Sequence, residues 1–213
     1  MESVLNNLDP ALQLIVLMAS LSLLPFIVVS MTSFMRYAIV LSILKTAMGT
    51  QQVPPAVVLV GMSLILTFYT MSPVFAEIVS VVTPMIEHGD SLVNVLMAAS
   101  DPLKEFMMRQ TQESDIAFFL EFTRKVMPES PDELMIWEVA PAYMISELRM
   151  AFEIGFILFV PFIVLDLVVA NILLALGMMM LSPTIISLPF KILVFVAVDG
   201  WSLIIHGLVQ SFR

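Results

Sequence analysis

The apolar residues of this chain fall into four long runs, separated by stretches that hold most of the charge. The runs cover residues 11–31, 56–75, 154–181 and 185–205, and neither of the first two contains a charged residue. A helix needs about 20 apolar residues to cross the hydrocarbon core of a bilayer. The pattern therefore predicts an all-α protein with four long, membrane-associated apolar helices. The last two runs read as a helical hairpin that turns near residues 180–183.

The first run resembles a retained helix more than a cleaved signal peptide. A signal peptide has a basic start and an apolar stretch of about 7–15 residues. Here Glu2 and Asp9 precede the run, no Lys or Arg does, and the run covers residues 11–31. We therefore expect this segment to remain in the protein.

The connection between the first two runs, residues 32–54, carries two bases and no acid. Residues 36–45 read as a short amphipathic helical piece, and Pro54 and Pro55 end it because proline does not continue a helix. Basic residues in short loops favour the cytoplasmic side. Arg36 and Lys45 therefore place this connection in the cytoplasm, and four spans then place both termini and the middle segment in the periplasm.

The middle segment, residues 77–153, is polar and predicted to be helical. Helical character extends over 101–126, and the sequence at 130–133 (SPDE) has the Ser, Pro and Glu of a helix start. The acidic face of these helices is expected to stay solvated, while large apolar side chains pack against neighbouring subunits. The residues predicted for this packing are Phe118, Phe119, Phe122 and Trp137.

Composition supports a membrane protein with three regions in one structural unit. The chain is 60% hydrophobic and 13% charged, with a mean hydropathy of +1.01, whereas soluble domains are about 25% charged. The net charge of −9 argues against a nucleic-acid surface. Residues 77–153 hold 14 acids and 5 bases, which alone account for −9. The regions expected are 1–76 (N-terminal apolar helices), 77–153 (acidic periplasmic segment) and 154–213 (C-terminal hairpin).

No pattern in the sequence predicts catalysis, a cofactor or a metal. The chain lacks cysteine, so disulfides, thiol chemistry and Cys-ligated metals are excluded. It contains no phosphate-binding loop, dinucleotide turn, HExxH or Gly-x-Ser-x-Gly. Its two histidines, His88 and His206, lie far apart in sequence. We therefore predict a protein that is not an enzyme.

Three charged residues interrupt the last two apolar runs: Asp166, Lys191 and Asp199. Asp166 precedes Met180 by 14 residues and Lys191 follows it by 11, so their depths in the hairpin differ by about 4.5 Å. Asp199 lies about 12 Å further from the turn than Lys191. Lys191 is predicted to pair with Asp166, or with an acid of a neighbouring subunit. A proton or ion relay, and a charge facing a water-filled path, remain alternatives.

Three consecutive methionines, Met178, Met179 and Met180, mark the predicted turn. Consecutive residues do not share one helix face, so at least one of them should point away from its neighbours' packing. Thioether side chains are flexible and adapt to irregular surfaces. Ordinary packing is one interpretation; a deformable hydrophobic constriction built from several such turns is the other.

Short motifs along nearly the whole chain resemble the FliP/SctR family of bacterial type III secretion. They lie at 32–36 (TSFMR), 51–55 (QQVPP), 161–169 (PFIVLDLVV), 177–183 (GMMMLSP), 187–191 (SLPFK) and 198–201 (VDGW). The resemblance implies a pore-forming core subunit of the export gate, which passes unfolded secreted proteins across the bacterial inner membrane. It also assigns the Met-rich turn at 178–180 as a gasket around the channel. The alternative function is an ion-coupled transporter or channel that uses Asp166, Lys191 and Asp199.

The same resemblance implies a set of partners and an assembly. About five copies would form a helical cone with FliQ/SctS-type and FliR/SctT-type subunits and an FlhB/SctU-type export switch protein. Much of this cone would stand on the periplasmic side of the inner membrane, in contact with lipid at its base. The short N-terminus favours the virulence injectisome branch over the flagellar one, whereas residues 71–75 (MSPVF), 187–190 (SLPF) and 208–212 (LVQSF) look flagellar.

Overall fold

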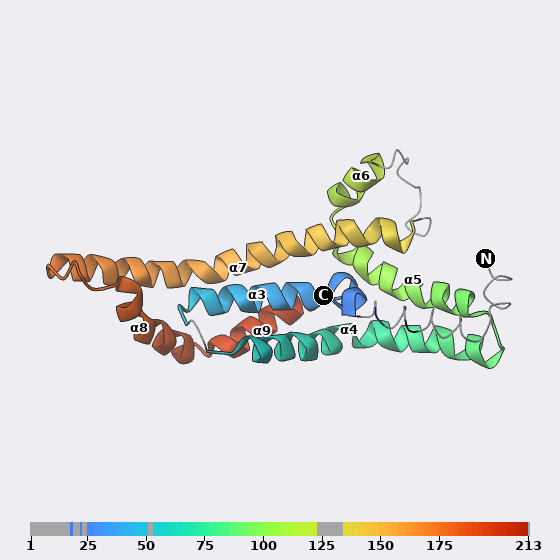
Figure 1. Cartoon of the computed structure of the whole chain (residues 1–213), viewed down its shortest axis with the longest axis horizontal. Helices are drawn as coiled ribbons and strands as arrows, with labels where there is room; N and C mark the ends of the chain where they lie inside the picture. The colour runs from blue at the N-terminus through green and yellow to red at the C-terminus, as the bar shows by residue number, and fades with distance from the viewer. Residues whose placement is uncertain (1–17, 19–21, 23–24, 51–52, 123–133, 213) are drawn as a thin grey trace. The chain divides into compact units, whose positions relative to one another are not determined.

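The computed structural model describes residues 18, 22, 25–50, 53–122 and 134–212 of the chain (Figure 1). Every regular element in these residues is an α-helix, which confirms the all-α prediction. A helix at Pro25–Met31 precedes the seven labelled ones. These are α3 (Phe34–Ala47), α4 (Ala56–Glu87), α5 (Leu92–Gln110), α6 (Glu113–Phe122), α7 (Ile136–Ala175), α8 (Pro183–Ala197) and α9 (Gly200–Gln210).

Two of the described helices, α4 and α7, are individually long and apolar enough to cross a membrane. The pair formed by Pro25–Met31 and α3 bends by 76°, and the pair formed by α8 and α9 bends by 65°. Each pair passes the same length and composition test if it is counted as one broken span. The described residues therefore supply two to four candidate spans, and most of the predicted first run, 11–24, lies outside them.

The fourth apolar run does not form the single helix that the sequence predicts. It divides into α8 and α9 at Val198–Asp199, where Asp199 adopts a left-handed backbone with φ of 51°. Gly200 follows, and its missing side chain leaves room for the Phe195 ring, since a Cβ there would lie 2.4 Å from Phe195 Cε2. The break is thus built from a left-handed residue and a glycine against an aromatic ring.

The middle segment is helical where it is described. The stretch expected to have helical character, 101–126, is covered as far as residue 122 by two helices, α5 and α6, separated at Thr111–Gln112. Ser91 caps the start of α5, because its hydroxyl accepts a hydrogen bond from the Asn94 N–H. Residues 123–126 and the predicted helix start at 130–133 lie outside the described residues. Helices α4 and α7 run without a break through positions 76 and 153, which are the two ends of the polar segment in the sequence.

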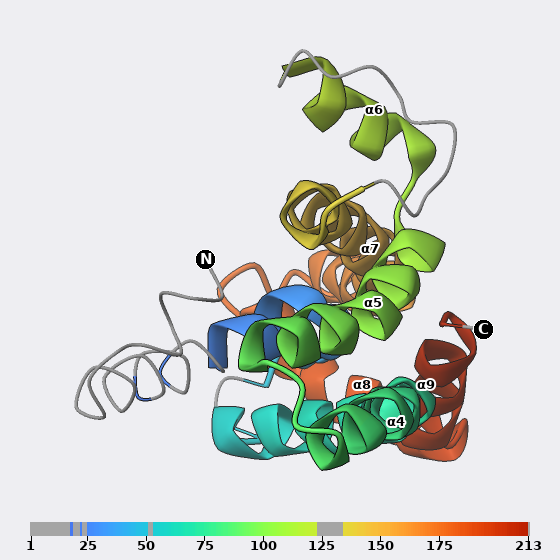
Figure 2. The ribbon, with the colours of Figure 1, turned by 90° about the vertical axis from the view of Figure 1, so that its right-hand side faces the viewer.

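The chain divides into two compact units, Met1–Phe34 with Met71–Glu147 and Met35–Thr70 with Leu148–Arg213. In the second unit, α3 is a core helix and not an amphipathic piece of a loop. Its fully buried residues Tyr37, Leu41 and Leu44 belong to a cluster that includes Phe162 of α7. α9 runs beside the first half of α4 in both views (Figure 1, Figure 2).

Gly155 allows α7 to approach α3 closely within this unit. A Cβ on Gly155 would lie 2.4 Å from Cδ1 and 3.1 Å from Cγ2 of Ile43. Gly155→Ala should therefore force Ile43 to shift and lower stability by about 1–3 kcal/mol, the usual cost of overpacking. The measurement is thermal and denaturant unfolding of the detergent-extracted protein.

Gly61→Ala is the matched control, because a Cβ at that α4 position meets nothing within 4 Å. Alanine is about 0.8–1.0 kcal/mol more favourable than glycine in a helix interior, so this variant should be neutral or stabilised. Equal unfolding midpoints for the two variants would contradict the close approach of α3 and α7.

Candidate functional site

The turn between α7 and α8 is fixed by backbone hydrogen bonds and not by side-chain packing. Gly177 adopts φ of +72°, and its N–H donates to the Leu174 carbonyl at 3.0 Å. The Met178 N–H donates to the Leu173 carbonyl at 2.9 Å, which completes a Schellman motif at the end of α7. Ser182 and Pro183 then start α8. Proline fits the first turn of a helix, because an N–H at that position would have no partner within the helix.

The three methionines project from this turn. Met178 is 46% exposed, Met179 is 78% exposed and Met180 is 100% exposed. In a single chain they therefore contribute little to the core, so ordinary internal packing does not account for their bulk. Thioethers held out on a fixed turn are free to contact another molecule.

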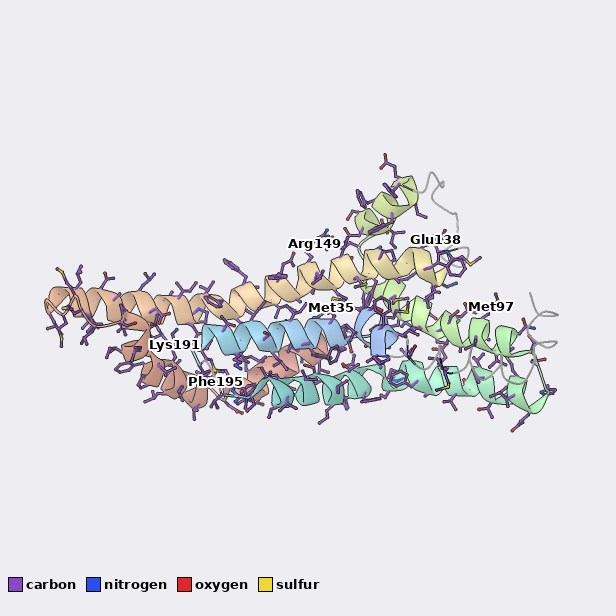
Figure 3. All side chains as sticks on the ribbon, viewed as in Figure 1. Met35, Met97, Glu138, Arg149, Lys191 and Phe195 are labelled. Carbon is purple, nitrogen blue, oxygen red and sulfur yellow. The ribbon has the colours of Figure 1, made fainter. Side chains whose placement is uncertain are left out.

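Behind the turn, Lys191 of α8 reaches Asp166 of α7. The Lys191 Nζ lies 2.7 Å from the Asp166 Oδ2, and Lys191 is only 3% exposed. Figure 3 shows Lys191 on α8, one turn before Phe195. The structure thus brings together the two charges that residue counting from the turn places at similar depth.

Two further groups complete the surroundings of this ion pair. The Lys191 ammonium also donates to the Ala47 carbonyl at the end of α3, at 3.2 Å. The last carbonyls of a helix carry the negative end of its dipole, so a cation is favourable there. The Ser187 hydroxyl donates to the Asp166 Oδ1. Each charge is therefore hydrogen-bonded as well as paired, which a buried ion pair requires.

Asp199, the third charged residue of these runs, takes no part in this network. It lies exposed at the α8–α9 break, caps no N–H of α9 with its side chain, and makes no ion pair among the described residues. The three residues therefore do not form one connected relay in the described part of the chain.

A second polar cluster forms around Arg36, and the sequence patterns did not indicate it. Its Nη1 donates to the carbonyl and the hydroxyl of Ser211 at 2.8 and 2.9 Å, and its guanidinium lies 3.8 Å from the centroid of the Phe212 ring. Arg36 is 1% exposed, so it is a core residue and not a free loop base. Ser211 lies 175 residues from Arg36 and Phe212 follows it, so no local pattern indicates these two contacts.

In the first unit, Asp115 of α6 is buried against α7. The Ser146 hydroxyl donates to the Asp115 Oδ2 at 2.6 Å and accepts from the Gln112 N–H at 3.1 Å. This network fixes α6 on the beginning of α7. Large apolar side chains remain exposed around it: Phe118 at 60%, Phe122 at 82% and Trp137 at 66%, while Phe119 is half-buried against the Phe118 ring.

Metal ligands do not converge in the part of the chain that the structure describes. No group of three His, Asp or Glu side chains is close enough there to hold an ion. The features of the described residues that bear on function are the Asp166–Lys191 ion pair, the exposed methionine turn and the exposed apolar helix faces.

Comparison with known proteins gives the family. The FliP family profile matches residues 17–208. The chain is 45% identical over 208 residues to flagellar biosynthetic protein FliP of Bacillus subtilis, covering 97% of this chain and 94% of that protein. It is 43% identical over 218 residues to the probable translocation protein y4yL of Sinorhizobium fredii, covering 98% and 97%. The chain belongs to the FliP family.

Membership of the FliP family makes the chain a membrane-embedded component of a flagellar or type III protein-export apparatus. FliP-family proteins are export components and are generally not enzymes. The similar proteins include flagellar proteins and also a pathogenicity-related protein of Xanthomonas campestris pv. glycines, 41% identical over 209 residues, covering 94% of this chain and 96% of that protein. The preference for the injectisome branch therefore stays a prediction.

Replacing Lys191 with methionine should leave the partly buried Asp166 carboxylate without its cation. Removal of one partner of a buried pair costs about 3–5 kcal/mol. We expect Lys191→Met to lower strongly the amount of the folded protein that is recovered from membranes. The double variant Asp166→Asn with Lys191→Met should restore much of it, because neither charge is then left unpaired. Yield is measured by extraction and size-exclusion chromatography.

Arg109→Met is the matched control, since Arg109 and Glu105 form an exposed pair on α5 at 3.0 Å. Exposed pairs one turn apart on a helix contribute only about 0.3–0.5 kcal/mol, so yield should hardly change. If the double variant recovers no better than Lys191→Met, the stranded carboxylate is not the cause of the loss.

Proposed function

We propose that this chain is a pore-forming core subunit of the export gate, and that Met178, Met179 and Met180 form the gasket of its channel. The gate passes unfolded secreted proteins across the bacterial inner membrane. The single observation that carries the proposal is the exposure of these three methionines on a hydrogen-bonded turn. Several copies of such a turn, gathered around one axis, close a narrow pore with apolar side chains.

The chemistry of the turn suits a gate for varied cargo. A narrow apolar constriction excludes water and blocks ions without a charged lock. Methionine has several rotatable bonds, so its side chain reshapes around a passing polypeptide of any sequence. The rigid part of the device lies behind it, where Lys191 and Asp166 hold α8 against α7. A firm base with deformable side chains gives a seal that reforms after each passage.

The proposed partners follow from the family. We expect about five copies of the chain to assemble with FliQ/SctS-type and FliR/SctT-type subunits and an FlhB/SctU-type switch protein, as a cone on the periplasmic side of the inner membrane. The exposed apolar faces of α4, α7 and α8 support burial against other chains or lipid. The exposed Phe118, Phe122 and Trp137 provide further contact area in the acidic segment.

The gasket is tested by replacing all three methionines with alanine. This change removes most of the bulk and keeps helix-compatible residues, so assembly should survive. The closed complex should then conduct small ions in a planar bilayer, whereas the wild-type complex stays closed. A triple variant as tight as wild type would place the seal elsewhere.

Two control variants test whether leakage depends on side-chain volume at this turn. Replacement of Met179 alone by leucine keeps the volume and should leave the bilayer closed. Met97→Ala, at a 63% exposed position on α5, removes an exposed methionine outside the turn and should not open the pore. Leakage from the Met97 variant would mean that conductance reports general damage and not the gasket.

The acidic segment is tested by Phe118→Ala with Phe122→Ala on α6. Loss of two exposed rings should reduce recovery of the multi-copy complex, with membrane insertion unchanged, because apolar area buried between subunits is lost. Native mass spectrometry measures the copy number. Unchanged assembly would show that these side chains face solvent in the complex. Ala117→Ser, an exposed neighbour on the same helix, is the control.

A further inference from the structure

Two charged side chains of the second unit have no ionic partner in the described residues: Lys45 on α3 and Glu153 on α7. Lys45 is half-buried, and Glu153 is exposed among large apolar side chains such as Phe156 and Ile157, which are 68% and 69% exposed. Glu153 makes no ion pair with Arg149, one turn before it on the same helix. An acid and a base with no ionic partner among the described residues thus lie on the surface of one unit.

The contact between α3 and α7 explains why these charges do not meet within one chain. Ile43 of α3 abuts Gly155 of α7, so these two residues mark the facing sides of the helices. Lys45 and Glu153 each lie two residues from that contact, which turns them by about 200° around their helices. Each charge therefore points away from the neighbouring helix.

Lys45 and Glu153 nevertheless lie at similar positions along the axes of α3 and α7. α3 and α7 run in the same direction (Figure 1). Along the helix axes, Lys45 lies about 3 Å beyond the contact between Ile43 and Gly155, and Glu153 lies about 3 Å before it. The two residues therefore differ by about 6 Å in axial position. A lysine side chain covers such an offset by extending along the helix surface.

The outer face of α7 is better suited to protein than to lipid. Glu153 and Asn171 are 18 residues apart, which is five full turns, so both lie on one exposed face. Charged and polar groups are unfavourable against hydrocarbon and face protein or water instead. Apolar residues between them, including Val160 and Val164, make the rest of this face attractive for a neighbouring helix.

We infer that the outer face of α7 in one copy docks against the outer face of α3 in the next copy, with Glu153 paired to Lys45 across the interface. The two surfaces differ, so the contact is heterologous and repeats from copy to copy around the assembly. Charge complementarity selects a second copy of this chain as the occupant. The inference rests on the proposed function, because it assumes that the gate contains several copies.

The absence of cysteine makes a direct cross-linking test possible. Two differently tagged forms, one with Glu153→Cys and one with Lys45→Cys, are co-expressed in the full complex. They are treated in membranes with a bifunctional thiol-reactive cross-linker, because a direct disulfide needs Cβ atoms about 3.5–4.5 Å apart, closer than a Lys–Glu pair requires. We expect a cross-linked product that carries both tags. The matched control replaces Lys45→Cys with Val60→Cys, at a 45% exposed position on α4. A mixed product no stronger than this control overturns the inference.

Charge reversal provides the second measurement. Glu153→Lys and Lys45→Glu should each lower recovery of the multi-copy complex about tenfold, because like charges then meet in the interface. The double variant should recover to near wild type. A double variant as poor as the single ones overturns the pairing.

The two proposals fail in different ways. If wild-type protein yields a multi-copy complex that the triple-alanine variant opens, but the cross-link is absent, only the pairing of Glu153 with Lys45 is wrong. If wild-type protein yields no multi-copy complex, the proposed gate and the interface both fail.

Discussion

The ammonium of Lys191 is the constraint on which the C-terminal hairpin depends. A buried cation must be paired, and its protons must find acceptors. Here the acceptors come from two other helices, since Asp166 belongs to α7 and the Ala47 carbonyl ends α3. Ser187 occupies the second oxygen of Asp166, so the carboxylate is oriented as well as neutralised. One side chain thereby fixes the relative positions of three helices.

This arrangement divides the hairpin into a rigid part and a deformable part. A buried ion pair adds little net stability compared with apolar packing, but it is strongly unfavourable to break. It therefore selects one register of α8 against α7 and excludes the others. The turn beyond it is held by main-chain hydrogen bonds and by a hydrogen bond between the Ser182 and Thr184 hydroxyls, none of which involves a methionine side chain. The ion pair thus fixes the position of α8 against α7, while the methionine side chains at the turn keep their rotational freedom.

The sequence predicted the features that follow from helical periodicity and missed those that depend on tertiary contacts. Counting residues from the turn placed Asp166 and Lys191 at similar depth because helical rise is constant. The break at Asp199 carried no such signal, since an aspartate in an apolar run does not by itself indicate a left-handed backbone. The separation of α5 from α6 at Thr111–Gln112 involves neither proline nor glycine. The burial of Arg36 depends on Ser211 and Phe212, at the opposite end of the chain.

Some charged residues of the second unit have partners inside that unit and others do not, and the two groups have different roles. Arg36, Asp166 and Lys191 find their partners inside the second unit, and they are the charges that its own packing requires. Lys45 and Glu153 lie on its surface with no ionic partner among the described residues, although both sit on predominantly apolar helices. A chain that folds in isolation gains nothing from such an arrangement, because an unpaired charge on an apolar surface is unfavourable in lipid. A neighbouring copy that supplied the opposite sign, as in the proposed pairing of Glu153 with Lys45, would make these charges favourable.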